Sequence, residues 1–461
     1  MTRVREISYH FNSRGFGIRG FGIRGFGIRG FGKGKSFCMR KFIVSVIVAL
    51  VVLCGASFYV YKTNNVNETY ENKENKEVNN NMLSMMLEKS AGSGEYQETT
   101  ANEWPTEGYV FNENLSKCEK GSNLSWDSTK NTVVMTGNNS DKCYVYFDVY
   151  VPPAINEVCS NGDTMSNCIK KLYTKQGENN LYLHDSSLTN GAKDNSYRYA
   201  GSSETTNNFV CFGYDSMDGS CSTDYLYRII GVFDNQAKLI KYDYAKSTLL
   251  GTDGDYGKTY QASGNKGTNK GQNSTSEIGG YYWHYLNNGL SYLNIWSESE
   301  LNIINLNKNY INNIGTKWSE KISDHTWKAG EVSWDRIAEQ TALNAYQNEI
   351  NNSDSSETVN AKVGLMYASD YGYAVSSNSW SITLNNYNEN IADNWMYMGL
   401  YEWILTPQEI PNAAFSVYNT GSVNSLEVNR YQCGVRPVFY LKSIVGYAGG
   451  SGTISSPILL K

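Results

Sequence analysis

The stretch YQCGVRPVFYL, residues Tyr431–Leu441, predicts the last core strand of the chain. The chain around it is polar, with 36 Tyr and only 40% hydrophobic residues, so a compact apolar stretch stands out. Alternate side chains of a strand point to the same face of a sheet. We therefore expect Val435, Phe439 and Leu441 to lie in the core of a large C-terminal domain.

Three residues in the middle of this stretch have structural roles that can be predicted. Gly434 allows a backbone geometry that a side chain would obstruct. Pro437 has no N–H donor and fits an edge or the start of a strand. Arg436 has to reach a carboxylate or a ring of carbonyl groups, because an unpaired buried guanidinium is very costly. We interpret these residues as scaffold rather than as a binding site.

Upstream, a β-hairpin is predicted where two apolar runs flank a short polar turn. The runs are YLYRIIGVF, residues 225–233, and AKLIKYDY, residues 237–244. Asp234, Asn235 and Gln236 form the turn between them, and Asp and Asn are typical turn residues. The hairpin and the last strand together indicate a sheet-rich domain.

Two helices are expected between this hairpin and the last strand. Residues 300–311 follow Ser297, which has capping-box spacing to Glu300. Residues 334–346 show one helical face, formed by Trp334, Ala338, Ala342 and Ala345. Short strands dominate the rest of the chain, and few helices among many short strands indicate an α+β fold.

No familiar catalytic or metal-binding motif occurs in the sequence. The four histidines are isolated from one another, and HExxH, GxSxG, P-loop and strand-associated GxGxxG motifs are missing. Asp253 and Asp255 in GTDGDYG lack the further carboxylates of a calcium loop, so we interpret them as a solvated turn. We predict that the protein is not an enzyme, and we assign it no metal and no cofactor.

Residues 106–153 are predicted to form a small β-module in front of the larger domain at 154–461. The runs TVVMTG and CYVYFDVYV alternate as strands do, with Asn, Gly and Ser at the turns. Cys118 and Cys143 bracket most of the module. A disulfide between them would stabilise it by roughly 3 kcal/mol in the chain-entropy model.

Seven cysteines follow residue 62. Sequence alone does not determine how they pair, but export would make disulfides possible. The plausible neighbouring pairs are Cys118 with Cys143, Cys159 with Cys168, and Cys211 with Cys221. Cys433 is left over, and its place beside the last strand predicts an inert buried thiol rather than a nucleophile.

The run FIVSVIVALVVLCGASFYVY, residues 42–61, is uncharged and long enough to cross a bilayer as a helix. Residues 1–41 carry a net charge of +9, which leaves −14 for residues 62–461 out of the total of −5. The positive-inside rule then places the N-terminus in the cytoplasm and the C-terminal domain outside the cell. We predict an uncleaved, single-pass signal anchor in the cell membrane, with cleavage after Gly55 or Ser57 as the alternative.

Two polar segments flank this predicted anchor. Residues 1–41 form a basic cytoplasmic tail with RGFGI repeats. Such repeats can stack on single-stranded nucleic acid, but an anchored protein needs only their positive charge, so we predict no nucleic-acid partner. Met39 is an alternative start. Residues 62–105 are rich in Asn, Glu and Lys and are predicted to be a flexible stalk.

Several segments of the C-terminal part resemble a large family of secreted or membrane-anchored proteins of low-GC Gram-positive bacteria. The segments are NNFVCFGYDSMDGSCSTDYLYRIIGVFDNQAKLIK, DHTWKAG, VGLMYASDYGYA, NWMYMGLYEWILTP and GVRPVFYLKSIVGYAGGSGTISSPILL. The resemblance covers roughly residues 205–461. It implies a C-type-lectin-like fold, similar to that of formylglycine-generating enzymes and of variable binding proteins of phages and bacteria. Residues 106–153 resemble a cysteine-closed β-module that recurs in such surface proteins.

The resemblance also implies a ligand-binding segment just before the last strand. In AAFSVYNTGSVNSLEVNRY, residues 413–431, the Tyr, Asn and Ser residues are of the types that form adaptable binding surfaces. The contact residues that we predict from this segment and its neighbourhood are Trp403, Tyr418, Asn419, Asn424, Asn429 and Tyr431.

The function that we predict is recognition by an anchored cell-surface protein that binds a carbohydrate or a protein ligand. Its other partner would be the lipid bilayer, through residues 42–61. One alternative is a structural envelope component without a small ligand. Another is an oxidase of the formylglycine-generating type, which would need a second cysteine close to Cys433.

Overall fold

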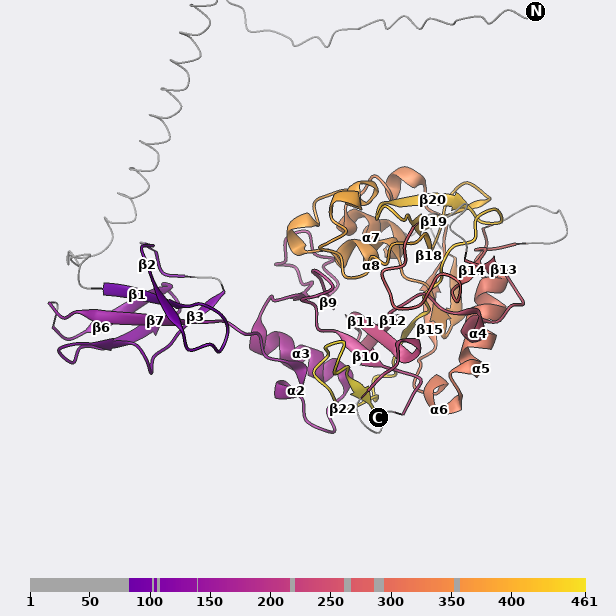
Figure 1. The fold of residues 1–461 in the computed structure, drawn as a ribbon. Coiled ribbons are helices and arrows are strands. Elements are labelled where there is room, and N and C mark those ends of the chain that lie inside the picture. The colour runs from indigo at the N-terminus through magenta and orange to yellow at the C-terminus, as the bar shows by residue number, and fades with distance from the viewer. Residues whose placement is uncertain are drawn as a thin grey trace, which may run out of the picture. The chain divides into compact units, whose positions relative to one another are not determined.

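The computed structural model describes residues 83–461, apart from positions 102, 106–107, 139, 216–219, 261–266, 286–293 and 352–356. The chain divides into two compact units between Val149 and Tyr150, close to the boundary predicted at residue 153 (Figure 1). The predicted tail at 1–41 and anchor at 42–61 lie outside the described residues. Within the part that is described, no helix is long and apolar enough to cross a membrane.

The first unit is built from short strands around a small apolar core. The described strands are β1 (Leu83–Glu88), β2 (Tyr96–Thr99), β3 (Tyr109–Phe111), β4 (Lys117–Cys118), β5 (Asn123–Asp127), β6 (Thr132–Thr136) and β7 (Cys143–Val149). One sheet has the order β2-β1-β7-β3, with β4 also paired to β7, while β5 and β6 form a hairpin. The Cys118–Cys143 disulfide joins β4 to β7, as predicted.

The structure corrects the predicted stalk and the start of the β-module. β1 and β2 lie inside residues 62–105, so the stalk prediction is wrong for these two strands and the module begins by Leu83. β1 runs parallel to β7, and Met85 is buried in the core of the unit beside Val145 and Phe147. The polar composition of the whole segment concealed the short apolar run LSMMLE. For residues 62–82 the stalk stays a prediction.

The second unit has an α+β fold, which confirms the predicted class. Its described strands are β8 (Leu181–Leu183), β9 (Tyr197–Tyr199), β10 (Phe209–Cys211), β11 (Leu226–Phe233), β12 (Gln236–Lys241), β13 (Tyr256–Thr259), β14 (Gly279–Tyr281), β15 (His325–Lys328), β16 (Thr358–Ala361), β17 (Val363–Gly364), β18 (Glu402–Pro407), β19 (Ala413–Val417), β20 (Val423–Glu427), β21 (Val438–Tyr440), β22 (Tyr447–Gly449) and β23 (Leu459–Leu460). The central sheet has the order β17-β21-β12-β11-β9-β8, with β10 also on β11. β18, β19 and β20 form a separate antiparallel sheet.

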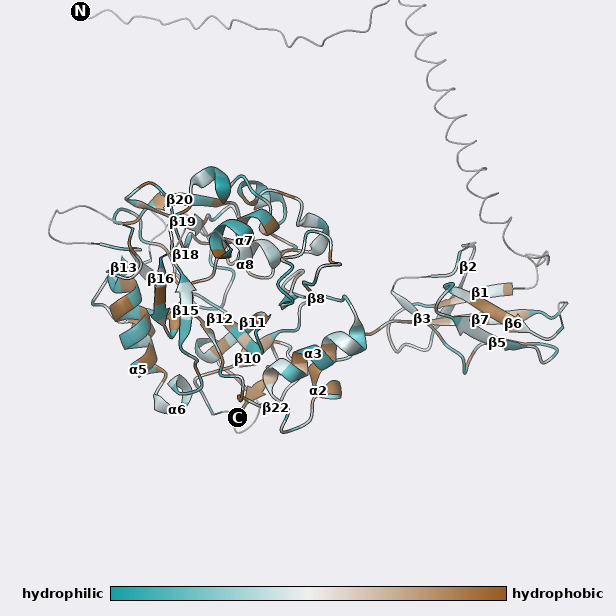
Figure 2. Cartoon of the chain, turned by 180° about the vertical axis from the view of Figure 1, so that it is seen from behind, coloured by the Kyte–Doolittle hydropathy of each residue, from teal (hydrophilic) through white to brown (hydrophobic). Residues whose placement is uncertain are grey.

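Short helices accompany these sheets. They are α2 (Ile155–Val158), α3 (Met165–Gln176), η1 (Thr223–Tyr225), α4 (Ser247–Leu250), η2 (Leu301–Tyr310), α5 (Ile311–Asn313), α6 (Thr316–Ser319), η3 (Trp334–Arg336), α7 (Ala342–Ile350), α8 (Ala368–Tyr373), η4 (Ser377–Ser379) and η5 (Leu384–Glu389). Hydrophobic and hydrophilic residues both occur along α3 (Figure 2), and its apolar residues Ile169 and Leu172 are buried in the core. The disulfides Cys159–Cys168 and Cys211–Cys221 confirm the other two predicted pairs.

The predicted strand is β21 of the central sheet, next to the edge strand β17, but it is not the last strand, because β22 and β23 follow it in the chain. β21 lies between β17 and β12, and Val435, Phe439 and Leu441 are buried, as expected. A Cβ atom on Gly434 would lie 2.6 Å from the ring of Tyr244, so this position excludes a side chain. Pro437 directly precedes the strand, which agrees with its predicted place at a strand start.

Arg436 has the carboxylate and carbonyl partners that its burial requires. Its Nε donates to Oε1 of Glu402 at 2.7 Å, and its Nη2 donates to Oε2 at 2.9 Å. Nη2 also donates to the carbonyl of Met396 at 2.7 Å. The guanidinium thus ties β18 to the segment that enters β21, which confirms the scaffold role.

Both predicted helices exist, but with different boundaries and caps. η2 begins at Leu301 and is of the π type, and Ser297 donates to Glu357 instead of capping it, so the predicted capping box is wrong. Residues 334–346 form not one helix but the short η3 and then α7, which begins after the N-cap Thr341.

Asp255 is not part of a solvated turn, so that interpretation is wrong. Its side chain is 1% exposed in the second unit. One carboxylate oxygen accepts from the backbone N–H of Tyr285 at 2.7 Å, and the other accepts from Leu301 at 2.8 Å. Asp255 therefore joins the start of η2 to the segment that follows β14. Burial raises the pKa of Asp255 to about 7, against the lowering effect of these two donors.

We expect Asp255→Asn to flatten the pH dependence of folding stability. The folded state holds the Asp255 proton more tightly than the unfolded chain does, so this residue makes the protein less stable as pH rises between about 4 and 7. Its contribution to the slope reaches about 1.4 kcal/mol per pH unit. Urea unfolding between about pH 5 and 7 measures the difference from the parent. Asp253→Asn, at an exposed position, is the control, and parallel curves for parent and Asp255→Asn would contradict the assignment.

Candidate functional site

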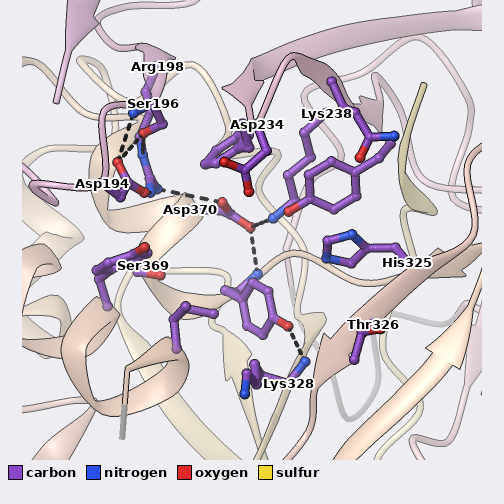
Figure 3. A pocket seen from close by; sticks show the side chains of 16 residues that line it. Asp194, Ser196, Arg198, Asp234, Lys238, His325, Thr326, Lys328, Ser369 and Asp370 are labelled. Atoms are coloured by element: carbon purple, nitrogen blue, oxygen red, sulfur yellow. Dashed lines mark hydrogen bonds and ion pairs between the residues drawn. The ribbon is translucent and has the colours of Figure 1, made fainter. Parts of the chain in front are cut away.

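The second unit contains a pocket of about 240 Å³ beside the central sheet (Figure 3). The Asp370 pocket, as we name it after the carboxylate on its floor, is lined by residues of β9, β12, β15, α7, α8 and β21 and of the β11–β12 turn. The charged side chains around it are Asp194, Asp234, Asp370, Arg198, Lys238 and Lys328. The three carboxylates balance the three basic groups, so the pocket is polar without a net charge of either sign.

The central sheet places the basic residues of the floor in one row. Arg198 on β9 lies opposite Gly231 on β11, and Gly231 lies opposite Lys238 on β12. Lys238 in turn lies opposite Tyr440 on β21. Side chains in one such row point to the same face of the sheet. A Cβ atom on Gly231 would lie 2.1 Å from the carbonyl of Tyr197, so the row needs glycine at this position.

Four charged groups form a buried network on the floor of the pocket. Nζ of Lys238 lies 2.5 Å from Oδ2 of Asp370, and both side chains are almost fully buried. Arg198 donates through Nη2 to Asp194 at 2.6 Å, and its Nη1 lies 3.9 Å from Oδ1 of Asp370. The network therefore alternates in sign from Asp194 through Arg198 and Asp370 to Lys238. A buried charge requires such a partner.

Aromatic faces form much of the remaining wall. The ring of His325 stacks on Tyr440, with a centroid distance of 3.9 Å and an interplanar angle of 21°. Nζ of Lys238 lies 4.9 Å from the ring centroid of Tyr367 and 5.3 Å from that of Tyr440. Arg198 lies over the ring of Tyr346 at 5.0 Å. Burial, together with the charge of Lys238, lowers the pKa of His325 to about 4, so this ring is neutral at pH 7.

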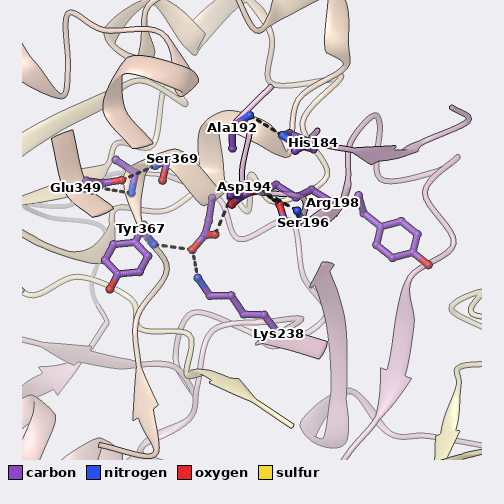
Figure 4. Close-up of polar contacts among 12 residues, drawn as sticks. His184, Ala192, Asp194, Ser196, Arg198, Lys238, Glu349, Tyr367 and Ser369 are labelled. Carbon is purple, nitrogen blue, oxygen red and sulfur yellow. Dashed lines mark hydrogen bonds and ion pairs between the residues drawn. The ribbon is translucent and has the colours of Figure 1, made fainter. Parts of the chain in front are cut away.

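Hydrogen bonds to nearby backbone N–H groups hold the charged residues of the floor in place (Figure 4). Glu349 of α7 accepts from the backbone N–H groups of Ala368 at 2.9 Å and Ser369 at 3.0 Å, which fixes the first turn of α8. Asp370 accepts from the N–H of Tyr367 at 2.9 Å. His184 accepts from the N–H of Ala192 at 3.0 Å through Nδ1 and so supports the loop that carries Asp194.

Trp403 does not lie at a ligand surface, so the prediction for this residue is wrong. It is fully buried in β18, and its indole Nε1 donates to the carbonyl of Tyr281 at 2.8 Å. A tryptophan within a buried strand supplies a large apolar surface and one donor, and both are used inside this domain.

The other predicted contact residues lie on or just after the sheet of β18, β19 and β20. Tyr418 is half-buried and donates to the carbonyl of Ser425 at 2.9 Å. The carbonyl of Asn419 accepts from Tyr397, and Asn424 accepts from Trp334 at 2.7 Å. These polar groups therefore serve internal contacts.

Asn429 and Tyr431 follow β20 and are partly exposed. Arg430 lies over the ring of Tyr431 at 5.5 Å. Two residues further on, Cys433 is a fully buried thiol, as predicted, and burial raises its pKa well above the usual value. A ligand role for Asn429 and Tyr431 stays a prediction.

Sequence reasoning did not identify the Asp370 pocket, although one signal pointed to it. Lys238 lies inside the apolar run AKLIK, and Arg198 lies between two tyrosines in YRY. A charged residue within a buried strand needs a buried partner. That partner, Asp370, is 132 residues away from Lys238 in the chain, so no local pattern could reveal it.

Comparison with family models, with curated proteins and with solved structures finds no match to this chain. Among the described residues there is also no group of three or more His, Cys, Asp or Glu that could hold a metal ion. The chemistry of the Asp370 pocket therefore has to be inferred from its own side chains.

Proposed function

We propose that this protein is a membrane-anchored cell-surface protein that recognises carbohydrate, and that its second unit holds one sugar ring in the Asp370 pocket. The observation that carries the proposal is the combination of aromatic faces with charged groups of both signs in a single concave site. Aromatic faces can cover the C–H side of a sugar ring, while carboxylates, amines and amides bind its hydroxyl groups.

The size of the pocket supports a small polar ligand. Its volume of about 240 Å³ lies below the range of roughly 300–1,000 Å³ for drug-sized ligands, so a single ring is a better fit than a larger molecule. The half-buried ring of His325 offers a face, while Asp234 is an exposed and Lys328 a half-buried part of the lining (Figure 3).

We also propose that the protein lies at the cell surface, held by a membrane anchor. Three disulfides in the described residues support folding in an oxidising compartment. The uncharged run at residues 42–61 supports the anchor. The lectin-like character of residues 154–461 rests on the resemblance of the C-terminal segments. Such a domain places its ligand on a rigid scaffold of sheets.

The oxidase alternative finds less support in the geometry. That chemistry uses a thiolate, and burial raises the pKa of Cys433 well above its ordinary value. Among the described residues Cys433 is the one free cysteine, so no second thiol lies beside it there. A structural envelope component without a small ligand remains the second candidate, because much of the predicted contact surface is engaged in internal hydrogen bonds.

We expect Lys328→Gln to weaken sugar binding by about tenfold or more, because a hydrogen bond from a charged donor contributes roughly 1.5–3 kcal/mol. The measurement is a glycan array with the soluble chain from residue 83 onward, followed by titration of the strongest glycan. Lys321→Gln, at a basic position outside the pocket, is the matched control.

Tyr431→Ala distinguishes the two possible binding surfaces. If Tyr431→Ala abolishes sugar binding and Lys328→Gln leaves it unchanged, the binding site lies in the segment after β20 and not in the Asp370 pocket. An array with no binding, together with retention of the protein on a cell-wall fraction, would favour the structural envelope component.

A further inference from the structure

The ion pair between Lys238 and Asp370 combines close contact with deep burial of both side chains. In the part of the chain that the structure describes, it is the one lysine–carboxylate pair with both side chains almost fully buried, at 1% and 3% exposure. Nζ lies 2.5 Å from Oδ2. Since the C–O bond adds about 1.2 Å, the carboxyl carbon is no more than about 3.7 Å from the amine nitrogen. Reacting atoms in a near-attack arrangement are about 3–3.5 Å apart.

Aromatic rings surround the amine of this pair, which is almost fully shielded from water. Nζ of Lys238 has the rings of Tyr367, Tyr440 and Phe233 at 4.9, 5.3 and 5.4 Å. Burial lowers the pKa of Lys238, which favours the neutral amine that acts as a nucleophile. Two ions that are buried away from water carry a large desolvation cost, and a neutral amide removes both charges at once.

We propose that Lys238 and Asp370 join in an intramolecular isopeptide bond. Nζ attacks the carboxyl carbon, a C–N bond forms, one C–O bond breaks, and the ammonium and carboxylate together release one water. The reaction is balanced without an oxidant, a reductant or another reactant. Holding the two groups in contact supplies the high effective concentration that such a condensation needs.

The neighbouring groups fit the product as well as the ion pair. Oδ2 accepts from the N–H of Tyr367 at 2.9 Å and can remain as the amide carbonyl. Oδ1 lies 3.9 Å from Nη1 of Arg198 and is the oxygen that leaves as water into the pocket. Arg198 keeps its partner Asp194 at 2.6 Å, so no unpaired charge is left behind.

The bond would link β12 to the start of α8 across 132 residues of chain. A cross-link over so long a loop restricts the unfolded chain strongly. It would act in addition to the disulfides and would be insensitive to reducing agents. The inference does not depend on the proposed sugar ligand, because it concerns the floor of the pocket alone.

Mass spectrometry of the reduced and alkylated full chain tests the proposal. We expect a mass roughly 18 Da below the sequence mass, equal to one water. Trypsin should fail to cut after Lys238, and a branched peptide should contain both Lys238 and Asp370. A chain of full sequence mass with normal cleavage after Lys238 overturns the proposal.

Two controls exclude other sources of the mass loss. Lys238→Arg retains a positive charge but offers no nucleophilic amine, so it should show its full sequence mass. If the deficit persists in that variant, it lies elsewhere, such as in a cyclic imide at an aspartate, and the proposal fails. The exposed pair Lys171 with Asp163, at 2.8 Å, should remain unlinked in the same digest. Should Lys238→Arg not fold, the branched peptide of the parent chain still decides.

Discussion

Glu402→Ala is expected to lower the free energy of unfolding by about 3–5 kcal/mol, because it leaves the buried guanidinium of Arg436 without its carboxylate. Both side chains are almost fully buried, and two hydrogen bonds of 2.7 and 2.9 Å join them. The remaining partner of Arg436 named above, the carbonyl of Met396, carries no full charge to compensate it. Equilibrium denaturation of parent and variant measures the effect.

The same experiment has a matched control within this chain. Arg430 and Glu427 form an exposed ion pair at 3.4 Å, so Glu427→Ala should cost less than about 1 kcal/mol. The double variant Glu402→Leu with Arg436→Met should regain much of the lost stability, because it removes both charges and keeps the volume. Equal losses for Glu402→Ala and Glu427→Ala would refute the scaffold role of Arg436.

Removal of the Cys118–Cys143 disulfide is expected to unfold the first unit. Its loop of 25 residues corresponds to roughly 3–4 kcal/mol in the chain-entropy model. The fully buried apolar residues of this unit form a small cluster, so little other free energy holds it. In a variant with alanine at both positions, the backbone amides of residues 83–149 should lose their protection against hydrogen exchange. The second unit should keep its protection, because its apolar core is separate.

Cys211→Ala with Cys221→Ala provides the comparison. This disulfide closes a loop of 10 residues beside a much larger core, so its loss should weaken the second unit without unfolding it. Persistent exchange protection of the first unit in the Cys118/Cys143 variant would show that β1 and β7 hold it without the cross-link.

The sequence predicted those features that depend on local pattern. The hairpin of β11 and β12 follows from two apolar runs around a polar turn, and Asp234 and Asn235 have the positive φ values that such a turn uses. The partners of Arg436 followed from the cost of burying its charge. The disulfides followed from cysteines that lie close together in the sequence and from the prediction that this part of the chain is exported.

The remaining features depend on contacts between distant residues. β1 belongs to the sheet because β7 lies beside it, and the sequence around β1 looks like a linker. The sequence around Asp255 has the composition of a surface turn, but its side chain is buried because it accepts hydrogen bonds from two distant N–H groups. The Asp370 pocket is lined by residues of β9, β12, β15 and α8, among other elements, so the periodicity of a single segment could not predict it. Trp403 was misassigned because an aromatic residue beside the predicted binding segment suits a core equally well.

The parallel pairing of β1 with β7 determines how the first unit would respond to mechanical force. The chain that precedes Leu83 enters β1 at one end, and the chain after Val149 leaves β7 at the opposite end. Tension between the N-terminal segment and the second unit would therefore slide these two strands past each other and load all of their hydrogen bonds together. An antiparallel pair pulled from adjacent ends would instead open one bond at a time. If the chain is tethered through its N-terminus, the first unit would act as a shear-resistant coupling between the tether and the domain that holds the pocket.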